Sequence, residues 1–324
     1  MKSMTLHQSR QGFKLENQVV NKSPGTIGWY EDKLDEFENW LLGQSLDQQD
    51  SAASPLLSDI TSDTIKNYIL YLQGRKTTLD NHPYCKPRNK PLSPYTIRGS
   101  FRSLSKFFNW AVSEGLISKS PMEKMTAPKV PKSVKPRFSQ EEIEKLLKAC
   151  DEYTDVLASR NRCIIKFLLS TGVRASELCG MTLEDLDIEH GRARIMGKGA
   201  IGREVHFGQG TQKELWKYVT IFRMSNSATD HVFLTREGKP LVGKRLQHIL
   251  IDIGQRAGVP DCHPHKFRHT SIRLKLRNGA DLPSVMREVG HSSLATTQIY
   301  AQMEREDVEI AMRRTDPVDN WGLK

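Results

Sequence analysis

A segment rich in proline and lysine divides this chain into two parts. Between residues 119 and 137 it carries the prolines Pro121, Pro128, Pro131 and Pro136 and the lysines Lys119, Lys124, Lys129, Lys132 and Lys135. Closely spaced prolines stop a helix from running through, and they keep the backbone extended. The chain of 324 residues is also longer than one ordinary domain requires. We therefore expect a domain over residues 15–118 and another over 138–324, joined by a basic linker over 119–137.

The first part shows apolar residues at helical spacing in three stretches, over residues 27–41, 62–72 and 94–111. The third is the best defined, because Ser93 can cap a helix whose first turn contains Pro94, and Gly115 can end it. Residues 1–14 are polar without such a period and predict a disordered tail. The first domain is therefore expected to be helical.

The second part is predicted to combine helices with a small antiparallel sheet. A capping box from Ser139 to Glu142 opens its first helix, and further apolar helical patterns continue to the end. Two short strand patterns, over residues 192–196 and 204–207, flank a turn that contains Gly197-Lys198-Gly199. The fold class is mainly α, with a helical N-terminal domain and an α+β second domain.

Charge and cysteine content favour a nucleic-acid partner for a chain that stays in the cytoplasm. Lys and Arg number 48 against 38 Asp and Glu, a surplus that suits a polyanion. The five cysteines form no CxxC pair, which is typical of reduced thiols, and the first residues contain no secretory signal. No carboxylate cluster suits Mg²⁺ and no phosphate-binding glycine loop is present, so we expect no cofactor and no metal.

Several polar residues lie at unusual places, and each also has an ordinary explanation. Arg174 follows a break between apolar helices and either pairs with Glu177 or faces an anion. Lys198, at a hairpin tip, is either solvated or swings onto a phosphate, and Tyr300 is either a core residue or a nucleophile. A zinc site is a further alternative, formed by Cys262, His263, His265 and His269. We disfavour it because no second cysteine pair or HExxH pattern completes it.

Taken in order, these segments resemble the active-site motifs of the tyrosine recombinase, or phage integrase, family. They are Ser170-Thr-Gly-Val-Arg174-Ala-Ser-Glu177-Leu178, Gly197-Lys198-Gly199, His265-Lys-Phe-Arg268-His269, Gly290-His291-Ser292 and Tyr300. The segment from Thr96 to Ile117 also resembles the family's helical core-binding domain. The resemblance implies the simple two-domain type, because no additional arm-binding domain is evident.

The resemblance also implies a role for each matching residue. Arg174 and Arg268 would hold the scissile phosphate, and Lys198 would protonate the leaving oxygen. His265 and His291 would assist at the phosphate, Tyr300 would be the nucleophile, and Glu177 would brace the first arginine and histidine. The implied product is a 3′-phosphotyrosyl link that is rejoined without ATP.

The partners follow from charge and from the same resemblance. Double-stranded DNA with specific sites is the expected substrate, contacted by Arg98, Arg102, Lys106, Lys129, Lys132 and Lys135. A homo-oligomer on DNA is expected, as a dimer at each site and a tetramer in the synapse, formed through the C-terminal tail and with accessory DNA-bending proteins as further partners. The alternatives are a type IB topoisomerase-like nicking-closing enzyme and a catalytically silent DNA-binding regulator.

Overall fold

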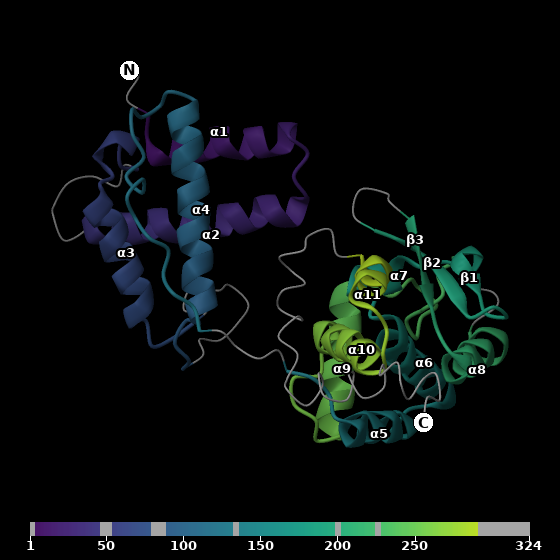
Figure 1. Ribbon diagram of the computed structural model, residues 1–324. Coiled ribbons are helices and arrows are strands. Elements are labelled where there is room, and N and C mark those ends of the chain that lie inside the picture. The colour runs from purple at the N-terminus through teal and green to yellow at the C-terminus, as the bar shows by residue number, and fades with distance from the viewer. Residues whose placement is uncertain are drawn as a thin grey trace, which may run out of the picture. The chain divides into compact units, whose positions relative to one another are not determined.

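The chain contains two separate structural units, drawn as ribbons in Figure 1. The computed structural model describes residues 4–45, 54–78, 89–131, 136–197, 202–223 and 228–290. Its contacts divide the chain into Met1–Ser133 and Val134–Lys324, each with its own apolar core. The mainly helical class with a small antiparallel sheet, as predicted, is confirmed.

The first unit is a bundle of helices. Its elements are α1 (Leu6–Val19), α2 (Pro24–Ser45), a 3₁₀ turn (Leu57–Asp59), α3 (Ser62–Gly74) and α4 (Pro94–Ser113). Helix α4 packs against the other three helices, and its fully buried Phe107 and Phe108 lie in the core. Ser93 caps α4 as predicted, accepting a hydrogen bond from the amide of Thr96 at 3.1 Å. Gly115 adopts a left-handed backbone just beyond the helix.

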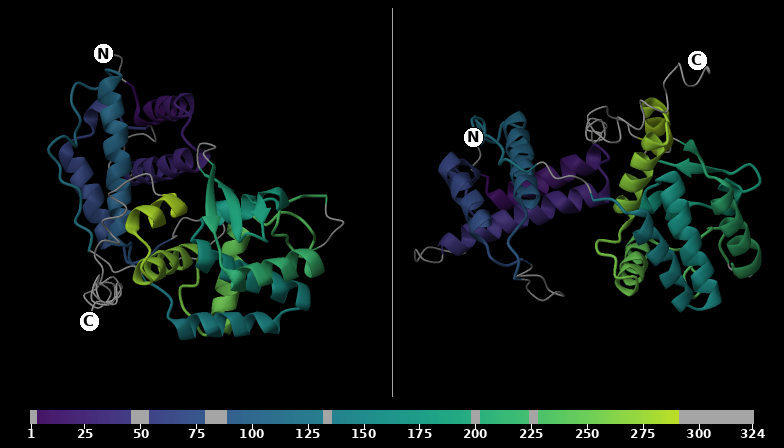
Figure 2. Two further views of the ribbon diagram at one scale, coloured as in Figure 1. Left: turned by 45° about the vertical axis from the view of Figure 1, so that its right-hand side comes forward. Right: turned by 60° about the horizontal axis from the view of Figure 1, so that its bottom comes forward.

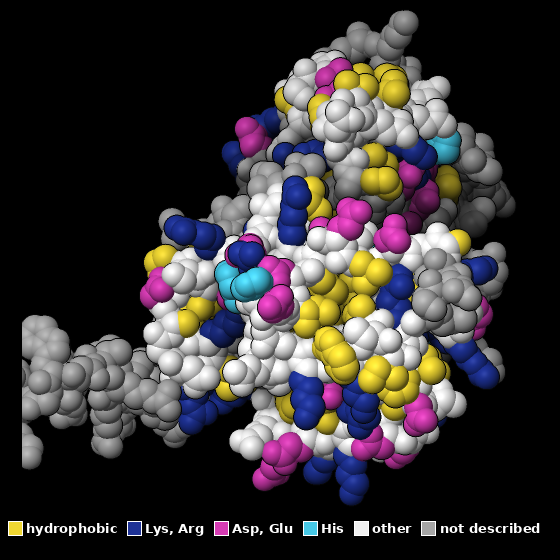
Figure 3. Space-filling model, turned by 90° about the vertical axis from the view of Figure 1, so that its right-hand side faces the viewer, with side chains coloured by type: hydrophobic (Ala, Val, Ile, Leu, Met, Phe, Trp, Pro, Cys, Tyr) yellow, Lys and Arg dark blue, Asp and Glu magenta, His cyan; other side chains and the backbone are white. Residues whose placement is uncertain are grey.

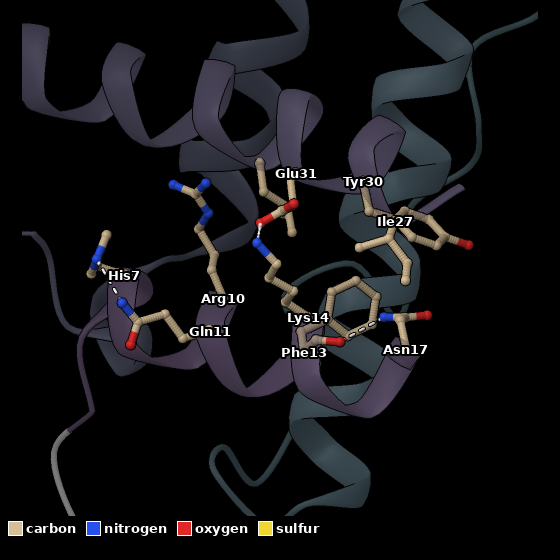
Figure 4. Close-up of a pocket in the computed structure, with 10 residues that line it drawn as sticks. His7, Arg10, Gln11, Phe13, Lys14, Asn17, Ile27, Tyr30 and Glu31 are labelled. Carbon is tan, nitrogen blue, oxygen red and sulfur yellow. Dashed lines mark hydrogen bonds and ion pairs between the residues drawn. The ribbon is translucent and has the colours of Figure 1, made fainter. Parts of the chain in front are cut away.

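The prediction of a disordered tail over residues 1–14 is wrong from Leu6 onward, because α1 packs in the bundle. Thr5 caps the helix, and the ring of Phe13 lies edge-on to Tyr30 at 5.4 Å between centroids. Lys14 pairs with Glu31 of α2 at 2.9 Å (Figure 4). The buried face of α1 consists of Leu6, Ser9, Phe13 and Asn17. Half of these residues are polar, which is why hydrophobic spacing did not reveal the helix.

The segment predicted as a linker belongs in part to the first unit. Met122 is buried in the core of that unit, with Met125 packed against it. The Ser62 hydroxyl donates to the carbonyl of Pro121, and the Tyr95 hydroxyl donates to the carbonyl of Pro131 at 2.7 Å. An extended linker over all of 119–137 is therefore the wrong description of its first half.

The second unit arranges helices around one central helix, α6 (Asp155–Thr171). The inward side of α6 is fully buried at Ile164, Phe167 and Leu168, and it packs against α8 and α10. The other elements are α5 (Gln140–Ala149), 3₁₀ turns at Cys150–Glu152 and Leu183–Asp185, α7 (Ala175–Gly180), α8 (Gln209–Lys217), a π-helical turn (Tyr218–Phe222), α9 (Gly243–Arg256), α10 (Pro264–Arg277) and α11 (Leu282–Val289).

Three short strands form an antiparallel sheet beside α7 and α11 (Figure 1 and Figure 2). They are β1 (Leu186–Asp187), β2 (Arg192–Met196) and β3 (Gly202–His206), in that order. On β2 the burial alternates, with Ala193 and Ile195 facing the core. Ile195 is paired with Arg203 of β3, so Arg203 lies on the core-facing side of the sheet.

Two glycines with left-handed backbones end the helices that lead to the site. Gly172 (φ 65°) ends α6 two residues before Arg174. Gly290 (φ 68°) ends α11 directly before residue 291. The residue that ends α6 and the last residue of α11 both lie beside α10, where Arg268 donates to the carbonyls of Gly172 and Val289.

Apolar side chains also appear on the outside of the second unit. Figure 3 shows them among lysines, arginines and carboxylates on one face, and the exposed large apolar residues of this unit include Val156, Trp216 and Ile221. Within the described residues, no helix combines the length and hydrophobicity needed to cross a membrane.

Candidate functional site

Arg174 lies at the N-terminal cap position of α7, where an ion pair fixes it. Its amide donates to Glu177 Oε2 at 2.7 Å and its guanidinium Nη1 donates to Oε1 at 2.9 Å. Nη2 donates to the carbonyl of Gly290 at 3.0 Å. The pairing with Glu177 is the ordinary explanation considered for this arginine, and it is present. The side chain is nevertheless 40% exposed, so part of its fork remains open to an anion.

Glu177 is a buried carboxylate held between two arginines. Besides Arg174, Arg203 donates from Nη1 to Oε1 at 2.9 Å and from Nη2 to Oε2 at 2.8 Å. Burial acts to raise the pKa of Glu177, but the hydrogen bonds from Arg203 and Arg174 outweigh it and lower this pKa to about 2. The carboxylate is therefore ionised at neutral pH and holds Arg174 in a defined orientation.

Arg268 and His265 lie on the first turns of α10, three residues apart. Arg268 is buried, and it donates from Nη1 to the carbonyl of Gly172 at 2.7 Å and from Nη2 to the carbonyl of Val289 at 2.6 Å. His265 is exposed. His263 caps the helix by accepting from the amide of Lys266 at 3.2 Å. Because Pro264 occupies the first turn, this start of α10 is well defined.

The structure brings together the two predicted phosphate-binding arginines. Arg174 and Arg268 donate to the carbonyls of the consecutive residues Gly290 and Val289, at the C-terminal end of α11. Arg174 and Gly290 are 116 residues apart in sequence, and Arg268 and Val289 are 21 residues apart. The turn that they hold leads directly into His291, the next residue of the predicted site.

The remaining predicted site residues divide by location. Those that lie outside the described residues are Lys198, His291 and Tyr300 of the catalytic set and Lys132 and Lys135 of the DNA-binding set. Arg98, Arg102 and Lys106 are exposed along one side of α4, opposite its buried apolar face. Lys129 is also exposed. Among the described residues no carboxylate forms an ion pair with these four side chains, which leaves their charges available to phosphates.

The zinc alternative gains no support from the described part of the chain. Cys262 lies in the core, and burial raises the pKa of its thiol to about 12. Nowhere among the described residues do three His, Cys, Asp or Glu side chains lie close enough together to hold a metal ion.

Arg203 is the residue of this site that sequence reasoning missed. Its signal was the alternation of β3, which places Arg203 on the same side as the buried Val205. An arginine on the apolar side of a strand requires a buried partner, and here that partner is Glu177. The partner could not be identified beforehand because it lies 26 residues away.

Two family models match the chain in order along its length. The phage integrase SAM-like domain matches residues 13–127, and the phage integrase family matches residues 136–307, which is more than half of the chain. The second match contains every predicted catalytic position from Arg174 to Tyr300.

Relatives and solved structures agree with these matches. The tyrosine recombinase XerC of Oceanobacillus iheyensis is 30% identical over 306 residues, covering 93% of this chain and 92% of its own. That of Bacillus subtilis is 30% identical over 292 residues and 88% of each chain.

Among solved structures, the integrase of the Tn1549 transposon in complex with a circular intermediate DNA has a TM-score of 0.71 at 19% identity, covering 96% of this chain and 99% of that one. The XerH recombinase in a post-cleavage complex with its difH substrate has a TM-score of 0.68 at 21% identity, covering 94% and 83%. These structures share the fold. The family match and the relatives show that the chain belongs to the phage integrase family of tyrosine recombinases.

Proposed function

We propose that this protein is a site-specific DNA recombinase that cuts and rejoins DNA strands through a 3′-phosphotyrosyl intermediate on Tyr300. The observation that carries the proposal is the meeting of Arg174 and Arg268 at the end of α11. Two guanidinium forks that converge beside one turn suit the non-bridging oxygens of a single phosphate. The membership of the chain in the tyrosine recombinase family supports the same conclusion.

In the proposed cleavage step, the Tyr300 oxygen forms a bond to phosphorus while the bond to the 5′-oxygen breaks. The phenolic proton passes to a base, for which His265 is the candidate, and Lys198 gives a proton to the leaving 5′-oxygen. His291 hydrogen-bonds the phosphate. Because the phosphotyrosyl link conserves the energy of the phosphodiester, a 5′-hydroxyl of a partner strand can reverse the step without ATP.

Arg174 and Arg268 would stabilise the charge that grows on the phosphate in the transition state. Preorganised donors of this kind contribute roughly 3–4 kcal/mol each in comparable sites. Arg174 is prepared for this role, since Glu177 fixes its guanidinium before DNA arrives. Arg268 is prepared by the carbonyls of Gly172 and Val289.

Other parts of the chain would bind the DNA duplex and form the oligomer. Arg98, Arg102 and Lys106 on α4, with Lys129, Lys132 and Lys135, would contact phosphates along the duplex. We further infer a dimer at each site and a tetramer in the synapse, through the C-terminal tail. The solved lambda integrase, whose fold this chain shares, was captured as a dimer bound to a core site and as a tetramer bound to a Holliday junction. We infer that the protein acts in the cytoplasm, because its expected substrate is chromosomal or mobile-element DNA.

A suicide substrate tests the chemistry. Duplex DNA from the flanks of the protein's own gene, nicked next to the cleavage position, traps the covalent adduct on a denaturing gel. We expect an adduct with the wild type, none with Tyr300→Phe, and an undiminished adduct with the exposed control Tyr71→Phe. An adduct that persists in Tyr300→Phe would contradict the proposal.

A second assay separates the proposed recombinase from the two alternatives. Strand exchange between two copies of one site is expected, and relaxation of any supercoiled plasmid without exchange would indicate a type IB topoisomerase-like enzyme instead. Specific DNA binding without any adduct would indicate a silent regulator.

A further inference from the structure

Three consecutive carbonyls at the end of α11 accept hydrogen bonds from three different arginines. Arg203 Nε donates to Glu288 at 2.6 Å, Arg268 to Val289 at 2.6 Å and Arg174 to Gly290 at 3.0 Å. The last carbonyls of a helix have no partner within it and carry the negative end of the helix dipole. The end of α11 is therefore a common anchor for side chains from β3, α10 and the start of α7.

Arg203 differs from Arg174 in that Nε, Nη1 and Nη2 of its guanidinium all donate to protein groups. Its Nη1 and Nη2 hold both oxygens of Glu177, and its Nε holds the Glu288 carbonyl. Its side chain is only 13% exposed, against 40% for Arg174. All three nitrogens thus donate to protein groups, two of them to the carboxylate that also holds Arg174, so Arg203 suits support of Arg174.

The contacts of Arg203 lead to Arg174 by two routes. One route passes through Glu177, which binds both guanidiniums. The other passes through the end of α11, where Glu288 binds Arg203 and Gly290 binds Arg174. A Cβ atom added at Gly290 would lie 3.0 Å from Arg203 Cζ, so the arginine also packs directly on this turn.

The same strand is attached to α11 by further contacts. The amide of His206, at the end of β3, donates to Glu288 Oε1 at 2.9 Å. The other oxygen of Glu288 accepts from Lys275 of α10. Glu288 therefore joins β3, α10 and α11 with its side chain while its backbone carbonyl receives Arg203.

We infer that Arg203 is a positioning residue that sets the orientation of Arg174, through Glu177 and the end of α11, for the cleavage chemistry. This inference rests on the proposed function of Arg174 as a phosphate ligand. It extends that function to a third arginine, whose guanidinium donates to the Glu177 carboxylate and to the Glu288 carbonyl.

The test compares Arg203→Met with the wild type in single-turnover cleavage of the suicide substrate. A misplacement of a reacting group by about 1 Å costs on the order of 10²-fold in rate, so we expect a loss of that size. DNA affinity, measured by fluorescence anisotropy, should stay within about twofold because the nitrogens of Arg203 donate to Glu177 and Glu288. Arg192→Met on the neighbouring strand is the matched control, since Arg192 forms an exposed pair with Asp187.

A substrate with a methylphosphonate at the scissile position separates positioning from a general loss of folded protein. The methyl group removes the negative charge that Arg174 balances, so the loss of rate in Arg203→Met should shrink at least tenfold on it, as it should for Arg174→Met. A merely structural defect would reduce the active fraction equally on both substrates. Equal losses on both substrates, or a wild-type rate on the phosphate, would overturn the inference.

Two further measurements keep the inference distinguishable from the proposed function. If Arg203→Met does not fold, Arg203→Lys replaces it, because a single ammonium cannot hold both Glu177 oxygens and the Glu288 carbonyl in the guanidinium geometry. If the wild type itself forms no adduct, the proposed function fails, and ¹⁵N NMR then tests the positioning alone. The Arg174 Nε–H signal should shift in the Arg203 variant, and an unchanged signal would overturn the inference.

Discussion

At Glu177, burial and hydrogen bonding act on one carboxylate in opposite directions. Burial alone would favour the protonated form, yet Arg203 and Arg174 bring the pKa down from an ordinary 4.5 to about 2. Because the pKa is lower in the folded than in the unfolded state, the ionised carboxylate stabilises the fold above pH 4.5. This stabilisation is lost as the pH falls from about 4.5 to about 2, and it amounts to about 3 kcal/mol when complete.

We therefore expect Glu177→Gln to lower the free energy of unfolding by up to about 3 kcal/mol at neutral pH. The difference from the wild type should shrink steadily as the pH falls below 4.5. Urea denaturation followed by circular dichroism at a series of pH values measures it. Glu184→Gln, at an exposed position, provides the control. A difference that stays constant with pH would show that the ionised carboxylate is not the source of the stability.

Single residues of the site were predictable from the sequence only where their immediate sequence neighbours form a recognisable pattern. Arg174 follows a glycine that breaks a helix, and Arg268 follows His265 at helical spacing, so both belong to recognisable segments. The partners of these arginines were not predictable, because Gly290 and Val289 are distant in sequence and contribute backbone atoms rather than side chains. Arg203 was missed for the same reason, since only the folded sheet places it over Glu177.

Among the secondary-structure elements, α11 depends most on how it ends. Gly290 has a positive φ of 68°, which costs a residue with a Cβ atom roughly 1–2 kcal/mol. An alanine there would also press against Arg203. Gly115 has the same φ of 68° but no atom within 4 Å of an added Cβ, so it is a matched control for the backbone effect alone.

We expect Gly290→Ala to destabilise the protein more than Gly115→Ala does. The additional loss of stability in Gly290→Ala should equal the free energy needed to displace the Arg203 side chain. The cleavage rate should fall in Gly290→Ala and stay normal in Gly115→Ala. Thermal unfolding of both variants, together with the suicide-substrate assay, measures the two effects. Equal destabilisation and normal cleavage in both would mean that Arg203 moves aside without consequence.

Elements with a continuous apolar stripe and a recognisable cap were predicted well. Helix α4 is the clearest case, since Ser93 and Pro94 begin it and Gly115 follows its end. Helix α1 was not predicted because its buried face alternates apolar with polar residues, and Asn17 satisfies its amide on the carbonyl of Phe13. The first half of the expected linker was misjudged because prolines indicate an extended backbone without indicating what it packs against.

For the whole molecule, the surplus of ten positive charges matters only where basic side chains are free of carboxylates. On α4 Arg102 is exposed and, in the described part of the chain, forms no ion pair. Lys66 on α3 also carries a positive charge, but its Nζ lies 2.8 Å from Asp63 Oδ1. The two positions therefore separate a charge that is available to phosphates from one that is already balanced.

The salt dependence of DNA binding should reveal this difference. Each phosphate neutralised by a protein cation releases condensed counterions, so the logarithm of the binding constant falls with the logarithm of salt concentration by about 0.9 per contact. Arg102→Gln should reduce the steepness of that dependence by about 0.9, whereas Lys66→Gln should leave it unchanged. Fluorescence anisotropy of the whole protein over a series of KCl concentrations measures both. If Arg102→Gln keeps the wild-type slope, Arg102 does not neutralise a DNA phosphate, because this slope counts only cations that displace counterions from DNA.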